Sequence, residues 1–385
     1  MIAEPRANPI AVMVHSLNPG GAQRRLVTLA NAFAAAGREV HFVALRGGGD
    51  VDRLLDPAVN FSVLDATPKP LWKPWMFEGW VKYTRWWIRH RPKAVLAGIT
   101  TVHNTALLGT LRGLDDKPIV ALRASRHPYR QFPWSRPFKK LFEPLERATR
   151  RRLYDRADLV IAVSRETAEA LKADMRHPER CVVLPNPTIT PDFTASLSHV
   201  PDQPWIGGDV PVILAVGRLA WQKRFDVLID ALAMVRRTRE VRAIILGEGR
   251  FRRDLERQLQ RLGLEDAVSL PGNVPDVGAW MAHADLLVST SAFEGSPAVL
   301  IEALAAGLPV VATRCPGGSV ELLENGEGGA LVPMDDPDAT ASAILEMLDR
   351  PRDRERLQRI ARPYTVGASA AAYLDALDKL VAQRG

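Results

Sequence analysis

Short apolar segments alternate with longer amphipathic segments along most of this chain. Strands that are apolar throughout are buried on both faces, as in parallel sheets whose connections are helices. The first half therefore predicts an α/β fold built from βαβ units. Its predicted strands are residues 10–15, 39–45, 61–64, 94–97, 119–122, 159–163 and 181–184, and its predicted helices are residues 22–36, 72–90, 103–112, 139–154 and 165–174.

The alternation stops between residues 185 and 211, a stretch with six prolines and little periodicity, which we interpret as a linker. It then resumes with predicted strands at residues 212–216, 243–246, 267–270, 286–289 and 310–312, separated by predicted helices. The 385 residues suffice for two domains, and the two halves predict two doubly wound, Rossmann-like sheets. We place these domains at residues 1–190 and 205–362, followed by a last helix near residues 363–385. Ligands of such sheets bind at the carboxyl ends of the strands, so we expect a site in a cleft between the domains.

The net charge of +7 is spread unevenly. Residues 68–156 hold 20 Lys and Arg against 6 Asp and Glu, a balance of +14, which leaves −7 for the rest of the chain. The same segment contains six of the nine tryptophans: Trp72, Trp75, Trp80, Trp86, Trp87 and Trp134. Basic residues mixed with tryptophan favour an anionic membrane surface, and they would also suit single-stranded nucleic acid, which we consider less consistent with the pattern. The alternative is an aromatic core, because Trp72, Met76, Trp80, Tyr83 and Trp87 follow helical spacing.

No apolar run approaches the roughly 18 residues that cross a bilayer, and the N-terminus lacks the basic-then-apolar pattern of a signal peptide. The two cysteines, Cys181 and Cys315, lie far apart and form no metal-binding or disulfide pattern. Reduced thiols are typical of the cytoplasm. We therefore predict a cytoplasmic protein that associates peripherally with the inner face of the cytoplasmic membrane.

Two glutamates eight residues apart, Glu294 and Glu302, flank a loop that runs into a predicted helix. Ser296 can cap this helix and Pro297 fits its first position, so the free N–H groups of the first turn would point outward and could bind an anion. A carboxylate on each side of an anion site suits a ligand with both phosphates and hydroxyl groups. A nucleotide sugar is such a ligand.

Further glycine-rich or basic loops follow other predicted strands. The first strand leads into Gly20 and Gly21, where backbone could approach a ligand closely. Arg218 and Lys223 follow residues 212–216 and could converge on a diphosphate. Turns after the next two strands could present backbone groups to a nucleotide; they contain Glu248, Gly272, Asn273 and Val274. The three spaced glycines of the dinucleotide fingerprint are absent, which argues against a nicotinamide enzyme.

These motifs, in this order, resemble those of retaining GT-B glycosyltransferases of glycosyltransferase family 4. The resemblance covers nearly the whole chain and rests mainly on Gly217-Arg218-Leu219 with Lys223, Gly247-Glu248-Gly249, Leu270-Pro271-Gly272 and the segment from Glu294 to Glu302, with weaker support from Gly20-Gly21-Ala22 and Arg24. It implies two Rossmann-like domains that face a cleft, with an acceptor-binding N-terminal domain and a nucleotide-sugar-binding C-terminal domain. It also implies that the C-terminal helix crosses back onto the N-terminal domain.

The same resemblance implies roles for individual residues. Arg218 and Lys223 would bind the donor diphosphate, Glu294 would contact the donor sugar, and Glu302 would hold the ribose hydroxyls. The segment from Gly295 to Val299, which comprises Gly295, Ser296, Pro297, Ala298 and Val299, would surround the donor. Its backbone would supply N–H groups to the donor, except at Pro297, which has none. Gly272, Asn273 and Val274 would border the base, and Gly20 and Gly21 would close on the phosphates.

The family often places a histidine at the end of an N-terminal strand, near the reaction centre. Two positions compete for this role. His103 follows the strand at residues 94–97, and His127 follows the strand at residues 119–122, next to Arg126. We favour His103 and regard His127 and Arg126 as acceptor-side candidates.

These features predict a metal-independent hexosyltransferase that needs no cofactor, because fixed cations and a helix N-terminus can stabilise the leaving diphosphate. Its donor is expected to be a uridine-linked sugar, with guanosine as the alternative, and its acceptor a lipid-linked or polysaccharide glycan of the cell surface. One rival is a nucleotide-sugar epimerase or hydrolase of the same architecture. Another is a non-catalytic protein that binds a nucleotide sugar.

Overall fold

The computed structural model describes residues 8–17, 21–65, 75–98, 117–124, 151–152, 154–294, 296–323, 326 and 328–384. The chain divides into two compact units. The N-terminal unit comprises Met1–Pro187 together with Val366–Gly385, and the C-terminal unit comprises Thr188–Thr365. The chain therefore passes between the units twice.

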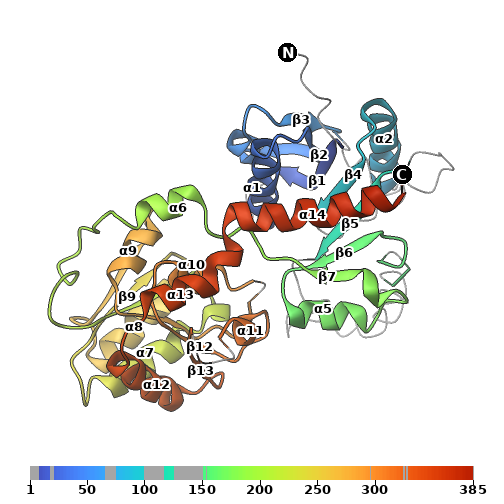
Figure 1. Ribbon diagram of the computed structural model, residues 1–385. Helices are drawn as coiled ribbons and strands as arrows, with labels where there is room; N and C mark the ends of the chain where they lie inside the picture. The colour runs from blue at the N-terminus through green and yellow to red at the C-terminus, as the bar shows by residue number, and fades with distance from the viewer. Residues whose placement is uncertain are drawn as a thin grey trace. The chain divides into compact units, whose positions relative to one another are not determined.

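The described strands of the N-terminal unit form a seven-stranded parallel sheet in the order β3-β2-β1-β4-β5-β6-β7 (Figure 1). The sheet reverses its winding direction between β1 and β4, as expected for a doubly wound sheet. The strands are β1 (Ile10–Leu17), β2 (Val40–Gly49), β3 (Asn60–Val63), β4 (Ala94–Gly98), β5 (Ile119–Ala124), β6 (Leu159–Ala162) and β7 (Cys181–Val183).

Helices cover both faces of this sheet, which explains why its central strands β4 and β6 are apolar and buried along their whole length. Alternate residues of β1 enter opposite layers: Ile10 joins the cluster that contains Phe33 and Tyr373, whereas Met13 joins the cluster that contains Trp87. The covering helices are α1 (Gly21–Ala35), α2 (Trp75–His90), α5 (Arg165–Lys172) and α14 (Val366–Arg384), with short 3-10 turns η1 (Val51–Leu54) and η2 (Pro178–Arg180).

The C-terminal helix α14 is part of the N-terminal unit, which confirms that it crosses back as the resemblance implied. Tyr373 and Leu377 of this helix are buried in the layer that also holds α1. Arg38 and Asp378 form an ion pair at 2.8 Å at the same contact. Deeper in the unit, the buried guanidinium of Arg123 on β5 donates to the Tyr373 hydroxyl at 3.2 Å and to the side chain of Asn186.

The described strands of the C-terminal unit form a second parallel sheet, with six strands in the order β10-β9-β8-β11-β12-β13. The winding direction reverses between β8 and β11, so the loops after these two strands border the switch point. The strands are β8 (Val212–Val216), β9 (Arg242–Leu246), β10 (Val268–Gly272), β11 (Leu286–Ser289), β12 (Val310–Thr313) and β13 (Gly329–Val332).

The helices of the C-terminal unit again lie on both faces of its sheet, over two separate apolar clusters. They are α6 (Pro191–Ser196), α7 (Phe225–Val235), α8 (Arg252–Leu262), α9 (Val277–His283), α10 (Ala298–Ala305), α11 (Ser319–Leu323), α12 (Pro337–Asp349) and α13 (Arg354–Ala361), with 3-10 turns η3 (Trp221–Lys223) and η4 (Arg362–Tyr364).

Several elements differ from the sequence prediction. The interpretation of residues 185–211 as a plain linker was wrong, because α6 lies within it and the C-terminal unit begins at Thr188. The sequence also missed β13, a four-residue strand that begins at a glycine, and α13, whose few apolar residues are widely spaced.

The tryptophan-rich segment forms part of the N-terminal core where it is described. Tyr83, Trp86 and Trp87 of α2 are buried, so these two tryptophans are not available to a membrane surface. The exposed side of the same helix carries Arg85 and Arg89 around Ile88, whose side chain is 50% exposed. The other four tryptophans of the segment have side chains outside the described set. Among the described helices, none has the length and apolar content needed to cross a membrane.

We predict that Tyr373→Phe lowers the free energy of unfolding of the N-terminal unit by about 1–3 kcal/mol, because it leaves the buried Arg123 guanidinium without one acceptor. Urea denaturation followed by circular dichroism measures this change.

Tyr83→Phe provides the matched control in the same unit. The Tyr83 hydroxyl is also buried, but it has no hydrogen-bond partner among the described residues. Its removal should leave stability unchanged or raise it slightly. Equal losses in the two variants would contradict a stabilising role for the Arg123–Tyr373 contact.

Candidate functional site

Loops at the carboxyl edge of the C-terminal sheet are joined to one another by backbone hydrogen bonds. The loop after β8 is joined to the loop after β9 by the N–H of Leu219, which donates to the carbonyl of Glu248 at 2.9 Å. The N–H of Gly247 donates to the carbonyl of Gly272 at 2.8 Å, which extends the series to β10. On the other side of β8, the N–H of Ala292 donates to the carbonyl of Gln222 at 2.8 Å. These bonds hold neighbouring loops in a fixed arrangement along one edge of the sheet.

An ion pair crosses the switch point of this sheet. The ammonium of Lys223, in the loop after β8, lies 2.7 Å from Oε1 of Glu294, in the loop after β11. Both side chains are mostly buried, at 16% and 14% exposure. The hydroxyl of Ser291 donates to the same carboxylate oxygen at 2.7 Å. The sequence thus predicted both charged residues of this pair, and the structure places them in direct contact.

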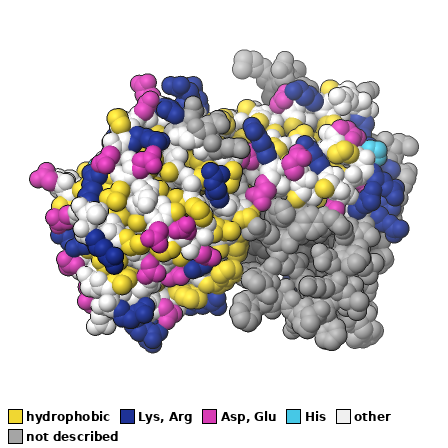
Figure 2. All heavy atoms as spheres, turned by 90° about the horizontal axis from the view of Figure 1, so that it is seen from below, with side chains coloured by type: hydrophobic (Ala, Val, Ile, Leu, Met, Phe, Trp, Pro, Cys, Tyr) yellow, Lys and Arg dark blue, Asp and Glu magenta, His cyan; other side chains and the backbone are white. Residues whose placement is uncertain are grey.

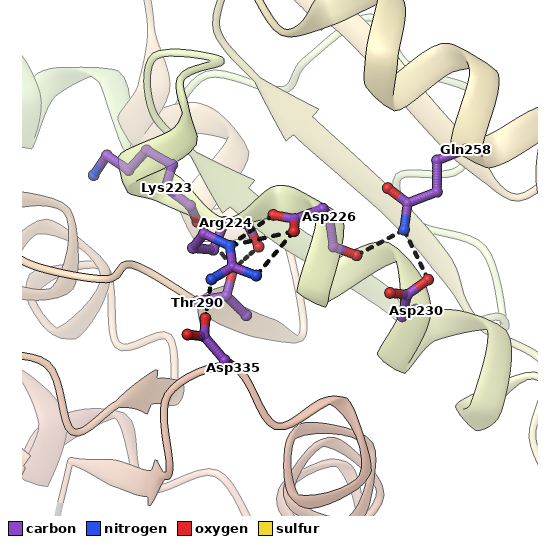
Figure 3. A network of polar contacts seen from close by, with 7 residues as sticks. All are labelled: Lys223, Arg224, Asp226, Asp230, Gln258, Thr290 and Asp335. Carbon is purple, nitrogen blue, oxygen red and sulfur yellow. Dashed lines mark hydrogen bonds and ion pairs between the residues drawn. The ribbon is translucent and has the colours of Figure 1, made fainter. Parts of the chain in front are cut away.

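A separate network fixes the backbone that carries Lys223 (Figure 3). The hydroxyl of Thr290 donates to the carbonyls of Lys223 and Arg224 at 3.0 and 2.8 Å. Arg224 has the left-handed backbone conformation, with φ of 47°, and its guanidinium pairs with Asp226 at 3.0 Å and with Asp335. The hydrogen bond to Asp226, with the charges of Asp226 and Asp335, raises the pKa of Arg224. The Lys223 side chain points away from this network, toward the switch point.

Two glycines allow the close approaches that the site requires. A Cβ atom at Gly217 would lie 2.7 Å from Cε of Lys223, so a larger residue there would displace the lysine. Gly317 follows β12 with φ of 118°, and a Cβ atom there would lie 1.8 Å from the carbonyl oxygen of Glu294. The neighbouring Pro316 carbonyl accepts a hydrogen bond from the Glu294 N–H at 2.8 Å. The loop after β12 therefore packs directly on the backbone of Glu294.

The helix that follows Glu294 begins one residue later than the sequence predicted. Helix α10 starts at Ala298, Pro297 is the residue before it, and no side chain caps it, so the predicted cap by Ser296 and the first position for Pro297 were wrong. The Ala298 N–H already donates to the Ser296 carbonyl at 2.8 Å. The first helical bond to a carbonyl four residues earlier is made by the N–H of Ile301. The N–H groups of Val299 and Leu300, which precede that bond, have no backbone partner among the described residues and could receive an anion.

The remaining predicted donor residues lie along the same edge. Arg218 is exposed, and its guanidinium makes no ion pair within the described ranges. Glu248 is paired with Arg252 at 3.3 Å, and its carboxylate lies beside Gly272. Asn273 is exposed and Val274 is partly buried, directly after β10. Glu302 lies half-buried on α10 and makes an interaction of its own.

Several predicted residues cannot be placed. Gly20, Gly295, His103, Arg126 and His127 lie outside the described residues. Gly21, at the start of α1, follows β1 in the N-terminal unit and is exposed. The competition between His103 and His127 therefore stays open.

The sequence did not identify Ser291, Gln222 or Cys315 as neighbours of the charged pair. Gln222 donates to the Phe293 carbonyl at 2.8 Å, and Cys315 is buried near Glu294 and Lys223. Burial raises the pKa of the Cys315 thiol, which therefore stays protonated at neutral pH. Serine and glutamine in loops are common, so only the three-dimensional contacts distinguish these residues.

The edge can bind a polyanion that also carries hydroxyl groups. It presents an exposed guanidinium at Arg218, an ammonium at Lys223 and the free N–H groups at the start of α10. Glu294 lies beside Lys223, and Glu302 lies on α10; the carboxylates of both residues can accept hydrogen bonds from hydroxyl groups. Across the part of the chain that the structure covers, no group of three or more His, Cys, Asp or Glu side chains is arranged to hold a metal ion.

Comparison with known proteins matches both halves of the chain. Residues 19–190 match the family described as Glycosyltransferase Family 4, and residues 210–350 match the family described as Glycosyl transferases group 1. A relative from Rhizobium meliloti (strain 1021), the lipopolysaccharide core biosynthesis glycosyltransferase LpsE, is 32% identical over 177 residues, which cover 46% of this chain and 51% of the relative.

A second relative is the N-acetylgalactosamine-N,N'-diacetylbacillosaminyl-diphospho-undecaprenol 4-alpha-N-acetylgalactosaminyltransferase of Campylobacter jejuni, which is 30% identical over 213 residues, or 54% of this chain and 56% of the relative. The chain thus spans about half the length of these curated relatives.

A solved structure of Anabaena Alr3699/HepE in complex with UDP has the same fold, with a TM-score of 0.75 and 22% identity over 97% of this chain and 100% of that one. The chain therefore contains a Glycosyltransferase Family 4 domain at residues 19–190, followed by a Glycosyl transferases group 1 domain at residues 210–350.

Proposed function

We propose that this protein transfers a hexose from a nucleotide sugar, with retention of anomeric configuration, to a lipid-linked or polysaccharide acceptor in cell-surface glycan synthesis. The Lys223–Glu294 pair at the switch point carries this proposal, because a cation that could bind phosphate lies beside a carboxylate that could accept hydrogen bonds from hydroxyl groups. The two relatives support the acceptor class, since their names refer to lipopolysaccharide core and to a diphospho-undecaprenol-linked glycan. The UDP in the Anabaena structure supports a uridine-linked donor.

The chemistry follows from the charge that develops on the leaving group. As the glycosidic bond breaks, negative charge grows on the nucleoside diphosphate, and preorganised donors that face this charge lower the barrier. Arg218, Lys223 and the N–H groups at the start of α10 would supply these donors. Glu294 would hold the donor sugar and Glu302 the ribose. The acceptor hydroxyl would attack on the face that the leaving phosphate vacates, and a phosphate oxygen would accept its proton.

Product analysis with the full-length protein tests this activity. UDP-linked and GDP-linked hexoses are incubated with the protein, with and without polyprenyl-diphosphate sugars or lipopolysaccharide core acceptors. Formation of an extended glycan that keeps the anomeric configuration of the donor is expected. Epimerised donor, or hydrolysis that no acceptor suppresses, would instead favour an epimerase or hydrolase. Nucleotide binding without turnover on any acceptor would favour a non-catalytic role.

We predict that Arg218→Ala lowers turnover about 10²–10³-fold, the usual effect of removing one preorganised charge stabiliser. Release of nucleoside diphosphate measures turnover. Arg253→Ala, which removes an exposed arginine from α8, is the matched control and should retain full activity. Near-normal turnover in Arg218→Ala would exclude the proposed role of this guanidinium.

We further propose that the transfer needs no metal ion, because protein cations and backbone N–H groups occupy the role that a metal plays elsewhere. Activity should persist after dialysis against excess EDTA. Loss of activity that magnesium or manganese restores would contradict the proposal.

We also propose that the N-terminal unit binds an anionic membrane surface. The support is the +14 balance of residues 68–156 and the exposed Arg85, Ile88 and Arg89 on α2. By contrast, the face of the C-terminal unit seen in Figure 2 mixes acidic and basic side chains.

Vesicles with anionic lipid should bind the protein in co-sedimentation assays, and binding should weaken as salt rises. Replacing Arg85 and Arg89 by glutamate should reduce binding, whereas the same double replacement of Arg253 and Arg261 on α8 should not. Equal binding to neutral vesicles would refute an electrostatic attachment.

A further inference from the structure

The two oxygens of the Glu294 carboxylate have different surroundings. Oε1 accepts hydrogen bonds from Lys223 and from Ser291, both at 2.7 Å. Oε2 makes no hydrogen bond with any residue that the structure describes. The carboxylate is therefore held by one oxygen and has the other available to a ligand.

The two donors to Oε1 differ in how firmly they are held. Lys223 has a long side chain with four rotatable carbons, and its ammonium has two further N–H groups. Ser291 is fully buried, at 0% exposure, and lies two residues after the end of β11. Its backbone carbonyl accepts a hydrogen bond from the Thr313 hydroxyl on β12 at 2.6 Å. Its short side chain is therefore fixed relative to the sheet.

This difference matters when a diphosphate binds. On the proposed function, Lys223 donates some of its N–H groups to the phosphates. Its hydrogen bond to Glu294 is then weaker. Ser291 has a single hydroxyl proton, and in this geometry that proton goes to Glu294. The contact with the Ser289 hydroxyl, at 3.4 Å, is then one in which Ser289 donates. Ser291 can thus keep the carboxylate in place whether or not a phosphate is bound.

We infer that Ser291 is a positioning residue for donor-sugar recognition, a role that rests on the proposed function. It touches neither sugar nor diphosphate, and acts by fixing the orientation of Glu294 so that Oε2 receives a sugar hydroxyl. The loss of this hydrogen bond should therefore affect binding of the sugar and leave binding of the nucleoside diphosphate unchanged.

The test compares two ligand sets by isothermal titration calorimetry. UDP and GDP report the diphosphate contacts, and their glucose, galactose, mannose and N-acetylhexosamine conjugates report the sugar contacts as well. In Ser291→Ala, the affinity for the conjugate that the unaltered protein binds best should fall about 10-fold or more, as for the loss of one hydrogen bond to a charged group. The affinity for the matching nucleoside diphosphate should change less than about 2-fold. Ser291→Cys keeps the size of the side chain with a weaker donor, so its loss should be intermediate.

Thr313→Val is the matched structural control. It removes another buried hydroxyl from the same loop contact, but this hydroxyl does not reach Glu294. It keeps the Ser291 hydroxyl that donates to Glu294, so it should lower the melting temperature but change the ratio of the two affinities much less than Ser291→Ala does.

Three outcomes would overturn the inference. One is an unchanged affinity ratio in Ser291→Ala, and another is an equal change in Thr313→Val, which would mean that loop stability alone matters. If the unaltered protein binds neither the nucleoside diphosphates nor their conjugates, the proposed function fails together with the inference.

Discussion

The ion pair between Lys223 and Glu294 is the interaction on which the proposed site depends. It joins the loops after β8 and β11, the two strands between which the C-terminal sheet reverses its winding direction. In a doubly wound sheet the connections diverge at this point, so the loops leave space for a ligand. The pair places a cation and a carboxylate at that space at low exposure, where competing water is limited. On the proposed function, this one contact would couple diphosphate binding to sugar recognition.

The structure around this pair separates rigid support from side chains that can respond to a ligand. Thr290, together with the ion pairs of Arg224, holds the backbone of Lys223, while backbone bonds join the neighbouring loops. Arg224 adopts a left-handed conformation that is unfavourable for a residue with a side chain, and its hydrogen bonds to Asp226 and Asp335 offset that cost. On the proposed function, the side-chain ends of Lys223 and Arg218 would turn toward phosphate against this fixed background. Preorganised support of this kind is what an electrostatically assisted reaction requires.

The sequence was most informative where local pattern and tertiary environment agree. Strands such as β8 and β11 are largely buried, so their apolar runs revealed them, and the sequence singled out Lys223 and Glu294 in the loops that follow them. Local signals failed where contacts distant in sequence decide the conformation. The start of α10 at Ala298 is one example, and β13, which pairs with β12 although it begins with glycine, is another.

Ser291 could not have been singled out, because its significance lies in a carboxylate three residues away whose orientation only the fold determines. The helical spacing of Tyr83 and Trp87 did predict burial, which the membrane interpretation of that segment had set aside.

A crystal structure of the full-length protein with a bound nucleotide sugar tests the central claim most directly. The account predicts the diphosphate within hydrogen-bond distance of Arg218 and Lys223, and a sugar hydroxyl that donates to Oε2 of Glu294. A nucleotide sugar bound away from the carboxyl edge of the C-terminal sheet, with the Lys223–Glu294 pair undisturbed, would contradict it.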